Sequence, residues 1–150
     1  QFSPMRKGHG CAAGFSLTEL LIVLVLVGIL TAFAYPSYKD HVRRAHRAQA
    51  RARLMEAAQF MQRFYAVNDR FDLQAGVVGV DAAVTLPANL RATTVPATYL
   101  ISLQSVARGA FVLAATPIGV MAGDPCGTLT LNQAGEQSAS GSWGAAACWR

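Results

Sequence analysis

Apolar residues are concentrated in one continuous run near the N-terminus. The segment 15–38 holds 17 hydrophobic residues among 24 positions, and Glu19 is its only charged residue. As a helix it would reach about 36 Å, which exceeds the roughly 30 Å of a bilayer's hydrocarbon core. Positions 20–30 are apolar on every helical face, which fits a buried core helix poorly in a chain of 150 residues. The pattern therefore predicts a membrane helix that carries one acid near its start.

A cleaved secretory signal is the alternative interpretation of this run. The apolar region of such a signal covers about 7–15 residues and ends in a small-residue cleavage site. Here the run is longer and continues into the sequence Ala32-Phe33-Ala34-Tyr35-Pro36, which offers no clear site. An acid inside a membrane segment needs a cationic partner, so Glu19 is a candidate functional residue.

Beyond Pro36 the pattern becomes that of an amphipathic helix. Pro36 cannot donate a helical hydrogen bond and is expected to kink the helix, with Gly28 as a second weak point. Apolar residues then recur at steps of three and four, which predicts a stripe that packs on a sheet. The predicted stripe comprises Val42, Ala45, Ala48, Ala52, Met55, Ala58, Met61 and Tyr65.

The opposite face of this helix is basic. Two acids, Asp40 and Glu56, stand against seven cationic residues: Lys39, Arg43, Arg44, Arg47, Arg51, Arg53 and Arg63. Three interpretations stay open, namely a solvated face near anionic lipid headgroups, a DNA contact, and pairing between subunits. The candidates for a DNA or lipid contact are Arg43, Arg44, Arg47 and Arg51. Base contacts would need aromatic or amide partners on an exposed face, whereas Phe60 and Phe64 fit a core better.

The rest of the chain predicts a connecting loop followed by strands. Residues 66–97 are rich in Gly, Pro, Ala and Val and show little periodicity, as is typical of a loop. Strands are predicted at 99–103, 110–116 and 127–132, and the last of these alternates cleanly. A helix followed by an antiparallel meander indicates an α+β domain, with the helix on one face of a sheet of three to four strands.

The start of the apolar run resembles a known signal. Gly14-Phe15-Ser16-Leu17-Thr18-Glu19 precedes the unbroken run, and a short basic leader with Arg6 and Lys7 comes before it. This arrangement looks like the class III signal of type IV pilins. The resemblance implies cleavage between Gly14 and Phe15 and N-methylation of Phe15, both by a prepilin peptidase/N-methyltransferase. It also implies that Glu19 neutralises the N-terminal amine of a neighbouring subunit, an attraction that is strong at low dielectric.

The resemblance also divides the chain. It implies a cleaved leader at 1–14 and a transmembrane and filament-core helix at 15–38. The head, at 39–150, includes the amphipathic second half of the helix. The resemblance further implies that Gly28 and Pro36 mark the stretch where the helix loosens in the filament. The first residue is Gln1, so Met5 is a candidate for the true start.

The C-terminal third resembles a narrower group. Asp124-Pro125-Cys126-Gly127-Thr128-Leu129-Thr130-Leu131-Asn132-Gln133-Ala134-Gly135-Glu136, with the ending Cys148-Trp149-Arg150, looks like the PilE-type minor pilins. That group includes the ComP-like pilins that bind DNA during transformation. If Cys11 leaves with the leader, two cysteines remain, and a disulfide between Cys126 and Cys148 is predicted to tie down the small, polar tail, as suits an oxidising compartment. The middle, 66–96, matches little.

Composition and charge qualify this picture. The chain is 53% hydrophobic and 14% charged, and the apolar excess lies in 15–38. The net charge is +5, yet residues 64–150 carry four arginines against five acids, which argues against strong DNA binding by the head. Six cationic residues at 39–53 against two in the leader would by themselves place the head in the cytoplasm. The pilin signal and the cysteines point to the outside instead.

No catalytic constellation and no cofactor are expected. The acids Asp69, Asp72 and Asp81 lack a base or a metal-ligand pattern, and the three histidines, His9, His41 and His46, lie far from the C-terminal cysteines. The leading hypothesis is a minor subunit of a type IV pilus that supports pilus biogenesis, twitching motility and adhesion. The alternatives are a ComP-like DNA-binding pilin and a type II secretion pseudopilin.

The pilus hypothesis specifies location and partners. The subunit would cross the inner membrane once, with a cytoplasmic N-terminus, and would then move into the extracellular pilus. Its partners would be the prepilin peptidase, other major and minor pilins, the inner-membrane assembly machinery and, in the alternative function, DNA.

Overall fold

The computed structural model of the chain describes residues 15–74, 82–93 and 96–150, apart from the side chains of 33–37. Gly14, the first half of the predicted cleavage site, lies outside the described residues. The chain divides into two compact units, Gln1–Lys39 and Asp40–Arg150. One long helix, α1 (Leu17–Asn68), contributes to both units.

In the first unit, α1 presents apolar side chains to the outside on all faces. The large apolar residues between Leu20 and Leu30 are each 50% exposed or more. The hydroxyl of Thr31 donates to the carbonyl oxygen of Val27 at 2.7 Å and to that of Gly28 at 3.0 Å, so this polar group is satisfied within the helix. Pro36 does not end the helix, and the kink stays a prediction.

No helix in the described part of the chain is both long and apolar enough to cross a membrane.

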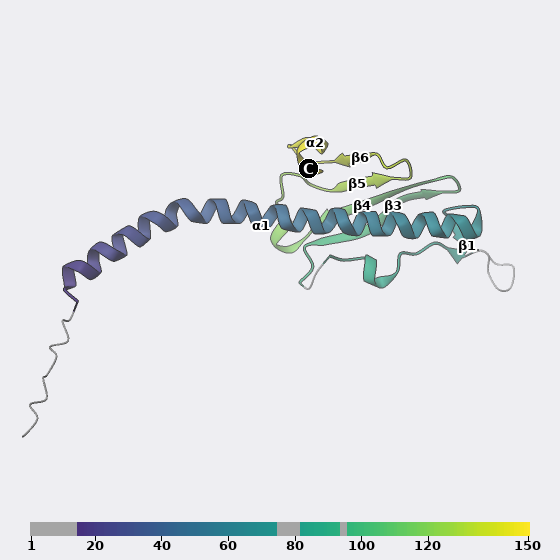
Figure 1. Ribbon diagram of the computed structural model, residues 1–150. Coiled ribbons are helices and arrows are strands. Elements are labelled where there is room, and N and C mark those ends of the chain that lie inside the picture. The colour runs from purple at the N-terminus through teal and green to yellow at the C-terminus, as the bar shows by residue number, and fades with distance from the viewer. Residues whose placement is uncertain (1–14, 75–81, 94–95) are drawn as a thin grey trace, which may run out of the picture. The chain divides into compact units, whose positions relative to one another are not determined.

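In the second unit, α1 lies across an antiparallel sheet (Figure 1). The four-stranded sheet has the order β3-β4-β5-β6, so each strand pairs with its neighbour in the sequence. Its strands are β3 (Tyr99–Ala107), β4 (Ala110–Pro117), β5 (Leu129–Asn132) and β6 (Gln137–Ala139). The fold class is therefore α+β, and the sheet of three to four strands is confirmed.

The core between helix and sheet follows both periodicities. Every second residue of the central strands is buried, as in Phe111, Leu113 and Ala115 of β4. The facing stripe of α1 consists of Ala50, Leu54, Ala57 and Met61, each of which is 0% exposed.

The predicted helical stripe is therefore wrong for most of its length. Of its members, Met61 is buried, Val42 and Ala58 are half-buried, and Ala45, Ala48, Ala52, Met55 and Tyr65 are exposed. Both stripes have the required spacing, because alanine recurs on several faces of this helix. The stripe that packs on the sheet continues N-terminally from Ala50 to Arg47. Because Arg47 is charged, the sequence pattern predicts it on the polar face instead. Phe60 and Phe64 are partly buried against the core, as expected.

The predicted loop 66–97 holds short elements in its described part. Helix α1 reaches Asn68, and a two-stranded ribbon and a 3-10 turn follow. These are β1 (Leu73–Gln74), β2 (Ala82–Ala83) and η1 (Ala88–Leu90). Asp72, one of the loop acids, accepts hydrogen bonds from Arg70 at 2.7 and 3.0 Å. Asp81 lies outside the described residues.

The C-terminal tail is ordered around a disulfide. Cys126 and Cys148 are bonded, as predicted, and both are buried. The tail also contains β6 and the one-turn helix α2 (Gly144–Cys148), neither of which the sequence indicated. The backbone N–H of Gly141 donates to the carbonyl oxygen of Cys126 at 3.0 Å, so Gly141 lies directly beside the first cysteine of the disulfide. A Cβ at Gly141 would lie 1.9 Å from the carbonyl oxygen of Pro125, so only glycine fits there.

Candidate functional site

A buried ion pair joins α1 to the segment before the disulfide. Nε of Arg47 donates to both carboxylate oxygens of Asp124, at 3.1 and 2.9 Å, and its Nη2 also donates to Oδ1. The hydroxyl of Tyr99, at the start of β3, donates to Oδ2 of Asp124 at 2.7 Å. Arg47, Asp124 and Tyr99 are 6%, 8% and 0% exposed, so the whole cluster is shielded from solvent.

The electrostatics of this cluster keep both charges in place. Burial favours the neutral form of Asp124, but the hydrogen bonds from Arg47 and Tyr99 outweigh it and hold the pKa of this carboxyl below its ordinary value. The hydrogen bond to Asp124 raises the pKa of Arg47. Burial, followed by the bond to Asp124, raises the pKa of Tyr99, so its hydroxyl stays a donor.

Arg47 also contacts the C-terminal tail. Its guanidinium carbon lies 4.8 Å from the centroid of the Trp143 ring, within the range of a cation–π contact. Trp143 as a whole residue is 52% exposed, so much of its surface stays accessible. The ion pair with Asp124 thus holds in place the guanidinium of Arg47, which contacts the Trp143 ring.

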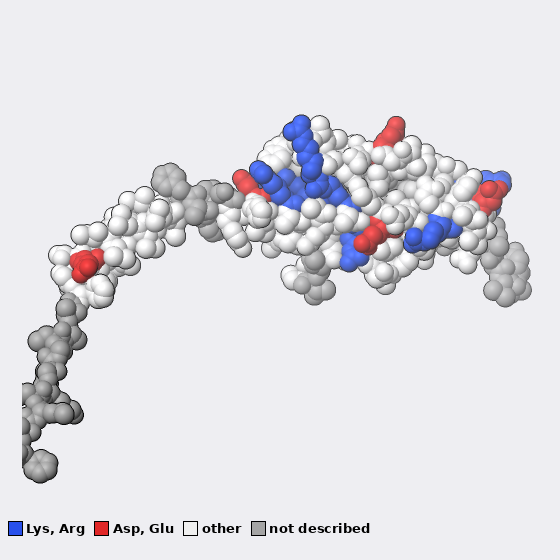
Figure 2. All heavy atoms as spheres, viewed as in Figure 1, with Lys and Arg blue, Asp and Glu red and all other residues white. Residues whose placement is uncertain are grey.

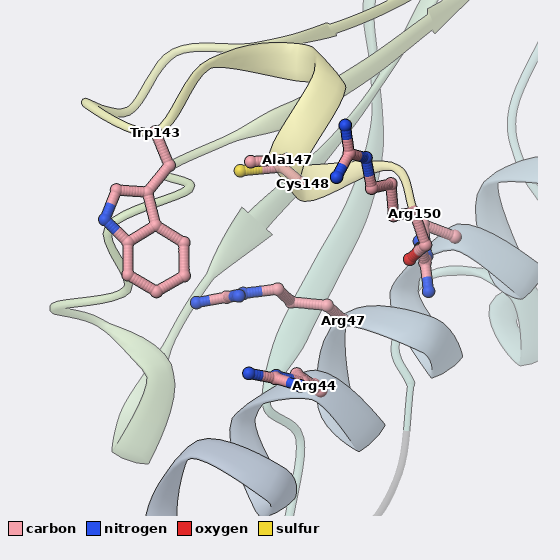
Figure 3. Close-up of a pocket in the computed structure, with 7 residues that line it drawn as sticks. Arg44, Arg47, Trp143, Ala147, Cys148 and Arg150 are labelled. Carbon is pink, nitrogen blue, oxygen red and sulfur yellow. Dashed lines mark hydrogen bonds between the residues drawn. The ribbon is translucent and has the colours of Figure 1, made fainter.

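A pocket opens beside this contact, between α1 and the C-terminal tail. Its volume is about 440 Å³, and its lining comprises Arg44, Arg47, Arg51, Trp143, Ala147, Cys148 and Arg150. In Figure 3 Arg44 and Arg47 extend from α1 on one side, while Trp143 and Arg150 stand on the C-terminal tail. Figure 2 shows basic side chains gathered over this stretch of α1. We call this cavity the arginine pocket.

The four arginines of the pocket differ in what already binds them. The charge of Arg47 is neutralised by Asp124. Nη1 of Arg51 donates to the main-chain oxygen of Arg150, which links the two walls. Within the described residues, neither Arg44 nor Arg51 nor Arg150 forms an ion pair with an acidic side chain. The pocket therefore offers cationic groups that can meet an anion.

Three of the four predicted contact residues meet here. Arg44, Arg47 and Arg51 line the pocket, whereas Arg43 does not and lies 3.9 Å from Asp40. The prediction that Arg47 belongs to a solvated face is wrong, because Asp124 draws it into the core.

Sequence reasoning missed the opposite wall of the pocket. Trp143 and Arg150 lie more than 90 positions after the pocket arginines of α1, in a tail without periodicity. The predicted disulfide was the available signal, because it holds the neighbours of Cys148 close to the sheet.

The predicted assembly residues lie in the first unit. Phe15 is 82% exposed, and together with Glu19, Leu20 and Val23 it lines a small depression at the start of α1. Glu19 occupies the first turn of the helix. Gly28 lies in an open stretch, where an added Cβ would meet nothing within 4 Å.

A long helix on an antiparallel sheet, with a disulfide-closed C-terminal region, defines the type IV pilin fold. The structure is similar to that of the non-core minor pilin PilV from Neisseria meningitidis, with a TM-score of 0.50 and 27% identity. That similarity covers 68% of this chain and 90% of the other. Residues 11–35 match the prokaryotic N-terminal methylation motif.

The family is identified by the match over residues 36–130. This stretch matches the family described as "Type IV minor pilin ComP, DNA uptake sequence receptor". The chain belongs to this family of type IV minor pilins, whose fold is that of structural subunits rather than enzymes.

Curated relatives match over a shorter length. The type IV major fimbrial protein FimA of Dichelobacter nodosus is 39% identical over 70 residues, which is 44% of each chain. The fimbrial protein EcpC of Eikenella corrodens is 49% identical over 37 residues, or 25% of this chain and 24% of that protein. The chain thus spans less than half the length of these relatives.

Proposed function

We propose that this chain is a minor structural subunit of a type IV pilus, assembled through the first half of α1. The observation that carries the proposal is the N-terminal methylation motif at 11–35, which includes a helical stretch, 20–30, whose large apolar side chains are exposed on all faces. A solvent-exposed helix of this kind is unfavourable in water, because apolar area of this size is normally buried. A bilayer, and then the packed helices of a filament core, would cover it.

The residues at the start of α1 would determine how the subunit is processed and how it aligns with its neighbours in the filament. A prepilin peptidase/N-methyltransferase would cut between Gly14 and Phe15 and methylate the new amine of Phe15. Glu19 would then pair with the N-terminal amine of an adjacent subunit. Since opposite charges attract far more strongly at low dielectric than in water, one such pair can fix how far neighbouring helices slide past each other.

Location and partners follow from the same mechanism. Before assembly the subunit would be anchored in the inner membrane with its N-terminus in the cytoplasm, and afterwards it would be part of the extracellular pilus. Its partners would be other major and minor pilins and the inner-membrane assembly machinery. Gly28 and Pro36 would let the helix loosen as it packs, and the disulfide-closed head would face outward.

The test is to locate the protein and read its N-terminus. Sheared and purified pili should contain it, and mass spectrometry should find a mature chain that begins with N-methylated Phe15. Glu19→Ala should be processed normally yet incorporated much less, and Glu19→Asp serves as the charge-retaining control. Absence from pili, or presence in a type II secretion complex instead, would overturn the proposal in favour of a pseudopilin.

A second candidate function is DNA binding at the arginine pocket. Two observations favour it. The family that covers residues 36–130 is described as a DNA uptake sequence receptor, and three of the four pocket arginines, Arg44, Arg51 and Arg150, have no acidic side chain as a partner among the described residues. Phosphates are the natural partners of such guanidinium groups. The nearly neutral remainder of the head limits the number of phosphates that can be contacted.

Binding of labelled DNA by the mature full-length protein in detergent tests this function. The complex should weaken as salt is raised, and Arg44→Gln should weaken it at constant salt. Arg63→Gln is the matched control, because Arg63 is an exposed arginine of the same helix outside the pocket. Absence of binding at low salt would remove this candidate without affecting the pilus function.

A further inference from the structure

We propose that the arginine pocket binds an unpaired nucleotide of single-stranded DNA, with its base stacked on Trp143 and with its own and the adjoining phosphates held by Arg44, Arg51 and Arg150. This inference rests on the DNA binding proposed above and names the form of DNA that the site would take. Trp143 and Arg150 lie beyond the residues 36–130 that match the family, so the match assigns them no role.

The indole of Trp143 has the properties of a stacking platform. Trp143 as a whole residue is 52% exposed, although an aromatic side chain of this size is normally covered in a folded domain. It is also held in position, since the guanidinium beneath it lies 4.8 Å from the ring centroid and is bonded to the buried Asp124. A base can therefore stack without first ordering the ring, which lowers the entropic cost of binding.

The surrounding cations supply the anion-binding half of the site. Arg44, Arg51 and Arg150 line the same cavity and lack acidic partners in the described structure. The planar fork of a guanidinium matches two oxygens of a phosphate group. The cavity volume of about 440 Å³ falls within the range of about 300–1,000 Å³ that is typical of sites for small molecules.

The position of the indole favours an unpaired nucleotide over a duplex. In a duplex the faces of the bases are stacked on one another, so only base edges and phosphates are accessible. A flat ring that lines a pocket cannot reach those faces, whereas single strands bind proteins through aromatic stacking together with a cationic track.

The charge of the head sets the expected salt dependence. With three arginines able to meet phosphates, the slope of log K against log salt should be about −2, at roughly −0.7 per phosphate of a single strand. A duplex bound along the whole basic face would give a steeper slope.

The experiment measures fluorescence anisotropy with the mature full-length protein in detergent. The probes are a labelled oligothymidine, the same oligonucleotide with abasic positions, and a duplex of equal length. Trp143→Leu should weaken binding of the single strand by roughly 5- to 150-fold, which is the range for loss of one base stack. Trp143→Phe should retain most of the affinity, and abasic positions should reproduce the loss in the unchanged protein.

Two arginine variants test the other half of the site. Arg44→Gln should weaken binding and make the salt slope shallower by about 0.7, while the control Arg63→Gln should leave both unchanged. Thermal unfolding and the intact disulfide serve to show that each variant is folded.

The outcomes separate the two proposals. Duplex binding that equals or exceeds binding of the single strand, and that is insensitive to Trp143→Leu, would overturn the stacking site and leave DNA binding intact. Absence of binding to any probe at low salt would overturn both. Preference for the single strand, lost in Trp143→Leu and with abasic positions, would support the site.

Discussion

Replacing Asp124 with asparagine would leave the guanidinium of Arg47 buried without its counterion. Arg47 and Asp124 are 6% and 8% exposed, and the pair is held by hydrogen bonds from Nε to both carboxylate oxygens. Removing one partner of such a buried pair costs about 3–5 kcal/mol, because the remaining charge is desolvated and unpaired. The hydroxyl of Tyr99 would also donate to a neutral amide instead of a carboxylate, which weakens its hydrogen bond.

Urea unfolding of the mature protein, followed by circular dichroism, measures this cost. With an m-value of about 2 kcal/mol/M, the unfolding midpoint should fall by roughly 1.5–2.5 M. The matched control is Asp72→Asn, which removes the partner of Arg70 in a pair whose side chains are 30% and 25% exposed. That variant should move the unfolding midpoint far less, because water screens a pair this exposed.

A double variant tests whether the unpaired charge is the cause. Arg47→Met combined with Asp124→Asn removes both charges and should recover much of the stability lost in Asp124→Asn alone. If Asp124→Asn costs no more than Asp72→Asn, the reasoning from burial is refuted. If the double variant is as unstable as the sum of the single ones, the loss comes from packing rather than from charge.

Three further predictions concern the same head. Because the pKa of Asp124 is lowered in the folded state, its ionised form stabilises the fold at pH values above the unfolded-state pKa of about 3.9. This stabilisation is lost as the pH falls through the folded-state pKa. Urea unfolding between pH 6 and pH 2 should show the loss, and the loss should be smaller in Asp124→Asn. Gly141→Ala should lower the melting temperature markedly, since its Cβ would lie 1.9 Å from the carbonyl oxygen of Pro125, and Gly109→Ala is the control in open space. Cys148→Ser should cost about 2–5 kcal/mol by removing the disulfide, measured by the same unfolding assay, and an unchanged midpoint would contradict it.

The parts of the fold that follow from the sequence are those with a strong local signal. The apolar run, the three strands of the meander and the disulfide each depend on spacing or composition within a short window. The helix stripe failed because alanine recurs on several faces, so periodicity alone did not distinguish the face of Leu54 from that of Ala52.

The pocket was only half predictable for a related reason. Arg44 and Arg51 are recognisable as a basic face, but their meeting with Trp143 depends on a tail that lacks a pattern. The burial of Arg47 was likewise hidden, because its partner Asp124 is 77 positions away. Local rules assign a charged residue to solvent unless its counterion is already known.

The buried pair has a consequence for the angular setting of α1. Each residue advances a helix by about 100°, so a shift of one position would carry the guanidinium of Arg47 away from Asp124. Alanines such as Ala50 and Ala57 discriminate weakly between neighbouring orientations, since they differ little in size from the alanines beside them. The Arg47–Asp124 ion pair, rather than hydrophobic fit alone, thus sets the rotation of α1 about its own axis, its azimuth. The outward-facing residues of this half of α1 can then vary while that azimuth is preserved.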